Sequence, residues 1–140
     1  MKWCLGERLI IIDVDPKDVR FTKKRFGGYF CKPYDDFSVN DAVNEINNGT
    51  MKHSDFPPIV VYRDEKGVLW SKNNKRLWVF RRAGVASVRA RISSKPFSRM
   101  PPPGLRRHEM SQPNYSPDIE FGTGTCAILE PSIYGNAFLK

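Results

Sequence analysis

The sequence has few of the residues that build metal centres and disulfide frameworks. Its cysteines are Cys4, Cys31 and Cys126, and its histidines are His53 and His108. The cysteines are odd in number, far apart and without a C-x-x-C pair, which argues against a zinc site or a disulfide framework. The two histidines lack acidic neighbours at ligand spacing, so no metal site is predicted. Free thiols favour a reducing intracellular compartment, either cytoplasm or nucleus.

Long hydrophobic runs and nucleotide-binding loop motifs are also missing. The apolar run at residues 9–12 is too short to cross a bilayer, and no signal-peptide cleavage pattern accompanies it, so no membrane partner is expected. There is no G-x-x-x-x-G-K-S/T phosphate loop, and G-T-G-T at residues 122–125 is only weakly similar to nucleotide loops. No internal repeat occurs, and 140 residues suit a single compact domain.

Acidic residues are fewer than basic ones, and the imbalance is concentrated in one stretch of the chain. The chain has 23 lysines and arginines against 15 aspartates and glutamates, a formal charge of +8. Nine basic and two acidic residues fall between positions 63 and 91, so this stretch alone carries +7. Clustered positive charge attracts polyanions and speeds their encounter. A basic face without any partner is the alternative interpretation.

The local patterns predict a mixed succession of strands and helices. Residues 8–14 are predicted as a buried strand. Ser38 as N-cap, Asp41 in the capping-box position and a stop at Gly49 predict a helix over 37–49. The further predicted elements are strands at 59–62 and 68–70 joined by a turn at 64–67, a helix at 75–83 ended by Gly84, and a strand at 85–92. This succession predicts the α+β class.

After residue 92 the composition changes. Residues 95–118 are rich in proline, serine and arginine, lack a sustained period and are predicted to be a linker. Residues 119–140 recover apolar character and are predicted to dock on the first domain, which spans residues 1–94. The chain is therefore expected to be one domain with a proline-rich C-terminal extension.

A polar loop that enters a basic helix is the strongest functional signal. Asn73 and Asn74 end the loop, and Lys75 and Arg76 begin the helix. Helix N-terminal amides and a guanidinium group suit phosphate oxygens. Residues 73–76 are therefore predicted to bind phosphate through the side chains of Lys75 and Arg76 and the backbone amides of Asn73 and Asn74. Three further cations are predicted to widen the contact with nucleic acid: Lys72, Arg81 and Arg82. Aromatic and basic residues alternate at 19–34, a composition that suits stacked bases.

The stretch at residues 56–92 resembles the ParB/sulfiredoxin superfamily. ParB proteins carry a G-E-R-R box that opens a helix, and sulfiredoxins carry G-C-H-R at the same place. Here Asn73-Asn74-Lys75-Arg76 falls on that box, L-W-V-F-R-R-A-G continues it, and a P-P-I-V-V strand precedes it. The resemblance implies a small mixed sheet with two or three packed helices. It also implies phosphate binding, because both basic positions of the box are kept.

The departures from the family leave its chemistry open. Asn74 stands at the position of both the sulfiredoxin cysteine and the ParB glutamate, so no thiolate is available there. A phosphate-binding module is the first hypothesis. The alternative is an NTPase, kinase or nuclease, with a nucleoside triphosphate and magnesium as candidate cofactors and with Asp13, Asp15 or Asp64 as carboxylates near strand ends. A protein-interaction domain that uses the proline-rich tail is the third hypothesis. The catalytic residues and the oligomeric state are left open.

Overall fold

The structure, a computed structural model, describes residues 10–30, 37–102 and 104–120. All three cysteines and the predicted docking segment beyond residue 120 lie outside the described residues, as do the first two residues of the predicted 8–14 strand. Within the described ranges, no helix has both the length and the apolar character that a membrane crossing requires.

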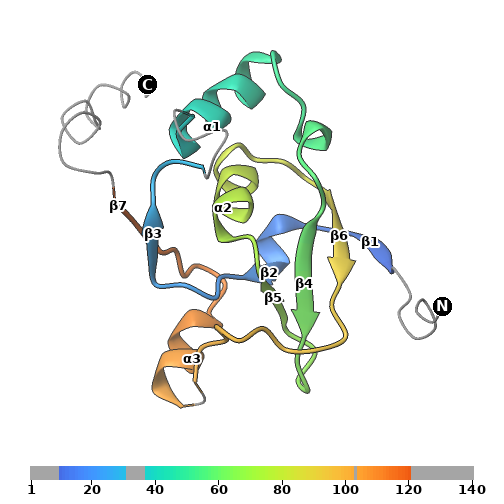
Figure 1. The fold of residues 1–140 in the computed structure, drawn as a ribbon, viewed down its shortest axis with the longest axis vertical. Coiled ribbons are helices and arrows are strands. Elements are labelled where there is room, and N and C mark those ends of the chain that lie inside the picture. Colours follow the sequence, from blue (N-terminus) through green and yellow to red (C-terminus); the bar gives the residue numbers. More distant parts are fainter. Residues whose placement is uncertain (1–9, 31–36, 103, 121–140) are drawn as a thin grey trace.

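A five-stranded mixed sheet forms the centre of the protein. Its strands, in spatial order, are β1 (Ile11–Val14), β6 (Val88–Ile92), β4 (Ile59–Arg63), β5 (Leu69–Ser71) and β2 (Val19–Arg20). β1 runs antiparallel to β6 and β4 antiparallel to β5, while the β4–β6 and β5–β2 pairs are parallel. The predicted α+β class is confirmed (Figure 1).

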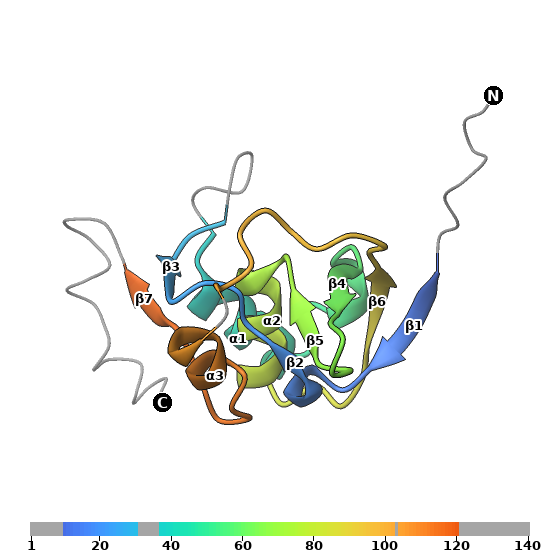
Figure 2. The same cartoon turned by 90° about the horizontal axis from the view of Figure 1, so that it is seen from below.

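Helix α2 (Asn74–Arg82) packs between this sheet and a second, smaller one, and α1 (Val39–Asn48) packs against α2. The small sheet pairs β3 (Arg25–Gly27) in parallel with β7 (Asp118–Glu120). Figures 1 and 2 both show α2 between the β3–β7 pair and the five-stranded sheet. Because α2 is enclosed in this way, its consecutive residues 77–80 are all buried.

Helix α1 follows its local sequence signals closely. Ser38 and Asp41 form the reciprocal capping box, with both hydrogen bonds at 3.0 Å. Gly49 ends the helix in the left-handed region, at φ 82°, where glycine has no Cβ penalty. Val39 and Ala42 are fully buried, three residues apart on one face of the helix. The prediction for this helix is confirmed.

The hairpin that leads to α2 is organised by Asp64. Its Oδ1 accepts hydrogen bonds from the backbone N–H groups of Lys66 and Val68, each at 2.9 Å, and its Oδ2 accepts one from Trp70 Nε1 at 2.9 Å. Gly67 takes φ 85°, as the predicted turn requires. The predicted hairpin at 64–67 is therefore confirmed, and Asp64 fixes its shape.

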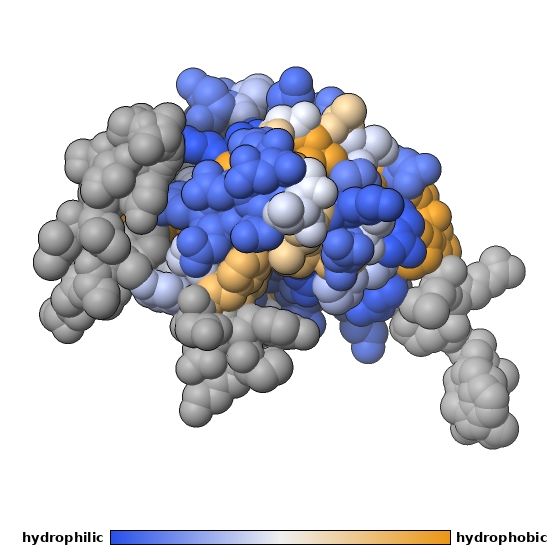
Figure 3. All heavy atoms as spheres, turned by 90° about the horizontal axis from the view of Figure 1, so that it is seen from above, coloured by the Kyte–Doolittle hydropathy of each residue, from blue (hydrophilic) through white to orange (hydrophobic). Residues whose placement is uncertain are grey.

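The first strand is an edge strand, which corrects the prediction of a buried one. Ile10 and Ile11 remain 48% and 45% exposed. Figure 3 shows apolar surface in orange on the side of the molecule where β1 lies. The apolar run suggested burial because hydrophobicity alone cannot tell a central strand from an edge strand.

The predicted linker at 95–118 covers the other face of the sheet. Phe97 packs edge-on against Tyr62 of β4, and α3 (Leu105–Met110) places Arg107 over the ring of Trp70, 5.9 Å from its centroid. Trp70 is fully buried, and Met110 is 2% exposed. The stretch thus contacts the sheet through Phe97 and Arg107. The predicted division into residues 1–94, 95–118 and 119–140 stays a prediction.

Candidate anion-binding cleft

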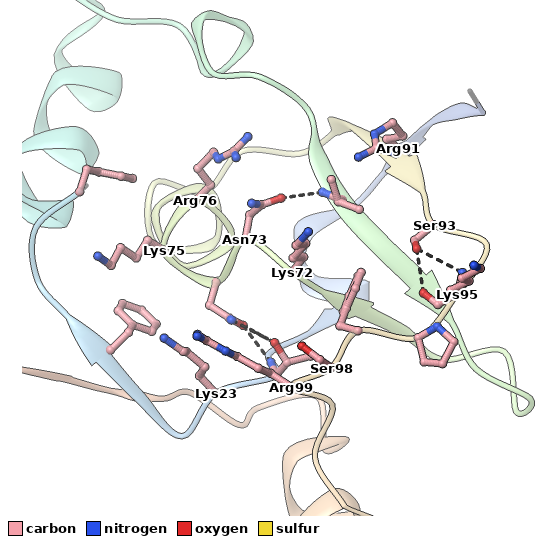
Figure 4. Close-up of a pocket in the computed structure, with 17 residues that line it drawn as sticks. Lys23, Lys72, Asn73, Lys75, Arg76, Arg91, Ser93, Lys95, Ser98 and Arg99 are labelled. Carbon is pink, nitrogen blue, oxygen red and sulfur yellow. Dashed lines mark hydrogen bonds between the residues drawn. The ribbon is translucent and has the colours of Figure 1, made fainter. Parts of the chain in front are cut away.

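A cleft of about 790 Å³ opens where α2 begins. Its floor is the loop between β5 and α2, and its walls are the loop after β6 and the connection from β2 to β3 (Figure 4). The charged side chains that line it are all cationic: Lys23, Lys72, Lys75, Arg76, Arg91, Lys95 and Arg99. Among the described residues, no aspartate or glutamate lines the cleft. The described lining of this concave surface therefore carries positive charge only.

The predicted phosphate-binding residues meet at this cleft. Residues 72–76 all line it. Lys75 and Arg76 are half-buried and come from the first turn of α2, whereas Lys72 is exposed and lies in the preceding loop. In the described part of the chain, the backbone N–H groups of Asn74, Lys75 and Arg76 have no protein acceptor. They are the unpaired donors that every helix start presents.

The two asparagines hold the floor of the cleft together. Asn74 is buried, and its Oδ1 accepts a hydrogen bond from the N–H of Thr22 at 2.8 Å, while its Nδ2 donates to Thr22 Oγ1 at 3.0 Å. Asn73 Oδ1 accepts from the N–H of Val60 at 2.7 Å. The N–H of Asn73 donates to Ser71 Oγ at 3.0 Å, so this amide, predicted to contact phosphate, is already used.

Lys75 and Arg76 have only neutral partners among the described residues. Lys75 Nζ donates to the carbonyl of Tyr29. Arg76 Nη1 donates to the carbonyls of Pro57 and Pro58, at 2.7 and 3.1 Å. Burial lowers the pKa of Arg76, but an arginine remains protonated at neutral pH. Both cations are thus held in place by carbonyls, with no carboxylate to neutralise them.

Four further cations line the cleft; three of them escaped prediction, and Lys23 belongs to the 19–34 stretch whose composition suits stacked bases. Among the described residues, no hydrogen bond or ion pair engages the side chain of any of them: Lys23, Arg91, Lys95 and Arg99. Arg91 could have been found from the alternation in β6, because it pairs with Val60 and so faces away from the buried Ala90. The other three are brought in by loops whose paths no local pattern specifies.

Arg81 and Arg82, also predicted to contact nucleic acid, lie away from the cleft at the other end of α2. Arg81 donates to the carbonyl of Pro113 at 2.7 Å and lies over the ring of Phe21, 5.1 Å from its centroid. Burial lowers the pKa of Arg81, and repulsion from Arg20 adds to the effect. Arg82 lies over the ring of Trp78 at 5.4 Å. The structure does not bring these arginines together with residues 72–76.

The three candidate catalytic aspartates are not at the cleft either. Asp13 is exposed on β1, and Asp15 caps a 3-10 turn by accepting from the N–H of Lys17 at 2.9 Å. Burial raises the pKa of Asp64, but its hydrogen bonds and nearby Arg107 outweigh this, and the net shift is downward. Within the described ranges, no three His, Cys, Asp or Glu residues group together as metal ligands.

No protein-family model matches the sequence, and a search of curated proteins finds no significant match.

Proposed function

We propose that this protein is a phosphate-binding module whose cleft at the start of α2 receives a nucleotide or nucleic acid. The observation that carries the proposal is the lining of the cleft, which has seven cations and, among the described residues, no carboxylate. Like charges held in a hollow repel one another, and an anion relieves that repulsion. Among the described residues, the side chains of five of these seven cations have no hydrogen-bond or ion-pair partner.

The first turn of α2 supplies the donors that a phosphate needs. Arg76 uses Nη1 for the two proline carbonyls, which leaves Nε and Nη2 for a ligand. Lys75 uses one of three N–H bonds for Tyr29. The unpaired backbone amides and the positive end of the helix dipole add to this set. Charge-assisted hydrogen bonds of this kind are short and strong.

Membership of the ParB/sulfiredoxin superfamily is part of the proposal. The order of α1, the β4 strand, the β5 loop, α2 and β6 supports it. Lys75 and Arg76 keep the two basic positions of the family's box. Asn74 occupies the position of the family's cysteine or glutamate, and its side chain is hydrogen-bonded to Thr22. Thiol chemistry and glutamate chemistry at that position therefore do not carry over.

The enzymatic alternative receives less support from the same cleft. An NTPase, kinase or nuclease needs a general base or metal ligands beside the phosphate. The described lining residues are lysines, arginines and neutral side chains, which do not fit a magnesium ion held by protein carboxylates. A nucleoside triphosphate with magnesium is the ligand pair that this alternative would require.

Calorimetry at low salt with a nucleoside triphosphate and with an oligonucleotide tests the proposal. We expect binding that Lys75→Gln and Arg76→Gln each weaken by about tenfold, which is about 1.4 kcal/mol. Arg63→Gln removes the same charge from the exposed end of β4 and serves as the matched control. Absence of binding to both ligands would overturn the proposal. Turnover of the triphosphate with magnesium would instead favour the enzymatic alternative.

A further inference from the structure

The cations of the cleft are spread along it. Figure 4 shows Lys23 and Lys75 on one side of the view, Lys72 near the middle, and Arg91 and Lys95 on the opposite side. Side chains that are apart in one projection are at least that far apart in space. A single phosphate placed on Lys75 therefore lies away from Arg91. The cations also come from separate segments of the chain: the β2–β3 connection, the start of α2, β6 and the loop after β6.

We propose that the ligand is a single strand of nucleic acid, laid along the cleft so that several phosphates are bound at once. The inference rests on the proposed phosphate-binding function and specifies its substrate class. A phosphomonoester carries about two negative charges at most. Seven cations exceed what one such group can neutralise. A strand with one charge per phosphodiester distributes its charge as the cleft does.

The shape of the site favours a flexible strand over a duplex. Proteins read duplexes with helices or strands that protrude into a groove. Here the start of α2 lies on the floor of a hollow, and the loop at residues 93–99 rises beside it (Figure 4). A single strand can bend into such a hollow, while the phosphates of a stiff duplex cannot follow its floor.

Two aromatic side chains line the same cleft and remain partly exposed. Phe30 stacks on Phe37 with ring centroids 5.9 Å apart, and Phe97 packs edge-on against Tyr62 at 6.3 Å. Their inner sides are fixed by these neighbours, and their exposed parts border the cationic row. Rings next to a basic groove suit unstacked bases without sequence preference.

Fluorescence anisotropy with thymidine oligonucleotides of increasing length tests the inference. The probes are labelled mono-, di-, tetra- and octanucleotides, the matching oligouridines and a blunt duplex. We expect affinity to rise with length up to the tetranucleotide or octanucleotide. We also expect a slope of log K against log salt of about −3 for the octanucleotide, as about four phosphate contacts produce on a single strand. The duplex should bind more weakly than the octanucleotide.

Variants at the two ends of the row separate this inference from the proposed function. Lys75→Gln should weaken every probe, whereas Arg91→Gln should weaken the octanucleotide by about fivefold and leave the mononucleotide unchanged. Arg89→Gln removes a charge from the same strand but outside the cleft, and is the control. Equal affinity for the mononucleotide and the octanucleotide overturns the inference while phosphate binding stands. Tighter binding of the duplex, or equal effects of Arg91→Gln and Arg89→Gln, also overturns it. If none of the probes binds, both proposals are overturned.

Discussion

Two groups of cations in this protein have opposite surroundings. Arg20 and Arg81 hold the segment that contains Ser111, Pro113 and Tyr115 against the rest of the fold by donating to its carbonyls, Arg20 to Ser111 and Arg81 to Pro113 and Tyr115. Arg107 belongs to that segment itself, donates to the carbonyl of Pro101 and lies over the ring of Trp70. In the cleft, only Lys75 and Arg76 donate to backbone carbonyls, and these carbonyls lie outside that segment. The side chains of the other five cations form no hydrogen bond or ion pair with any described residue.

We interpret the difference as one between a structural role and the proposed ligand-binding role. Arg81 and Arg107 also lie over aromatic rings, so their guanidinium faces are covered as well as their edges. A cation with both faces and edges occupied has little left to offer a ligand. A cation in a hollow with free N–H groups has its full capacity available.

The largest effect is expected for the floor of the cleft. Asn74→Ala removes both hydrogen bonds to Thr22 and leaves the buried N–H of Thr22 without a partner. The free energy of unfolding in urea should fall by about 2 to 3 kcal/mol. Asn44→Ala, on the exposed side of α1, is the control. A loss no greater than that of the control would show that the floor does not depend on Asn74.

The next effect concerns the structural arginines. Arg81→Ala removes the bonds to the carbonyls of Pro113 and Tyr115 and the contact with Phe21. We expect a loss of about 1.5 to 2 kcal/mol in unfolding free energy, with unchanged affinity for phosphate anions. Arg82→Ala, which loses only a ring contact with Trp78, should cost less. Weakened anion binding by Arg81→Ala at full stability would reverse the assigned roles.

The opposite behaviour is expected for a cleft cation. Lys72 is exposed and its side chain has no bonded partner among the described residues, so Lys72→Gln should leave the unfolding free energy unchanged. Affinity for the oligonucleotide should fall by about fivefold, which is about 1 kcal/mol. Lys66→Gln, in the hairpin turn, removes the same charge outside the cleft and should have no such effect. A measurable loss of stability without loss of affinity would contradict the contrast.

The smallest expected effect is a pH dependence of stability that comes from Asp64, which lies near the structural Arg107. The folded pKa of Asp64 lies below its ordinary value of 3.8, so ionised Asp64 stabilises the fold above that value. This contribution is lost as the pH falls through the lower, folded pKa. The unfolding free energy of Asp64→Asn should be lower than that of the unsubstituted protein at neutral pH. The difference between the two, measured by urea unfolding, should become smaller as the pH drops below about 4. A difference that does not change over this range would contradict the shift.

Local chemistry explains which elements were predictable. The capping box of Ser38 and Asp41, the turn at Gly67 and the start of α2 within a residue of its predicted place all depend on neighbours in the chain. The packing of 95–118 against the sheet was not predictable, because its contacts with Trp70 and Tyr62 join residues far apart in sequence. Burial of β1 was overestimated for the same reason.

The sequence by itself determined the order of α1, β4, β5, α2 and β6, the +8 charge and the basic start of α2, since propensities, caps and charges belong to single residues and near neighbours. Only the tertiary structure decided which cations line the cleft. It brought Lys23, Arg91 and Arg99 to the cleft from three separate segments, and it placed the guanidinium of Arg81 against carbonyls. The physical reason is that a charge acquires its role from the groups that folding brings within hydrogen-bond reach.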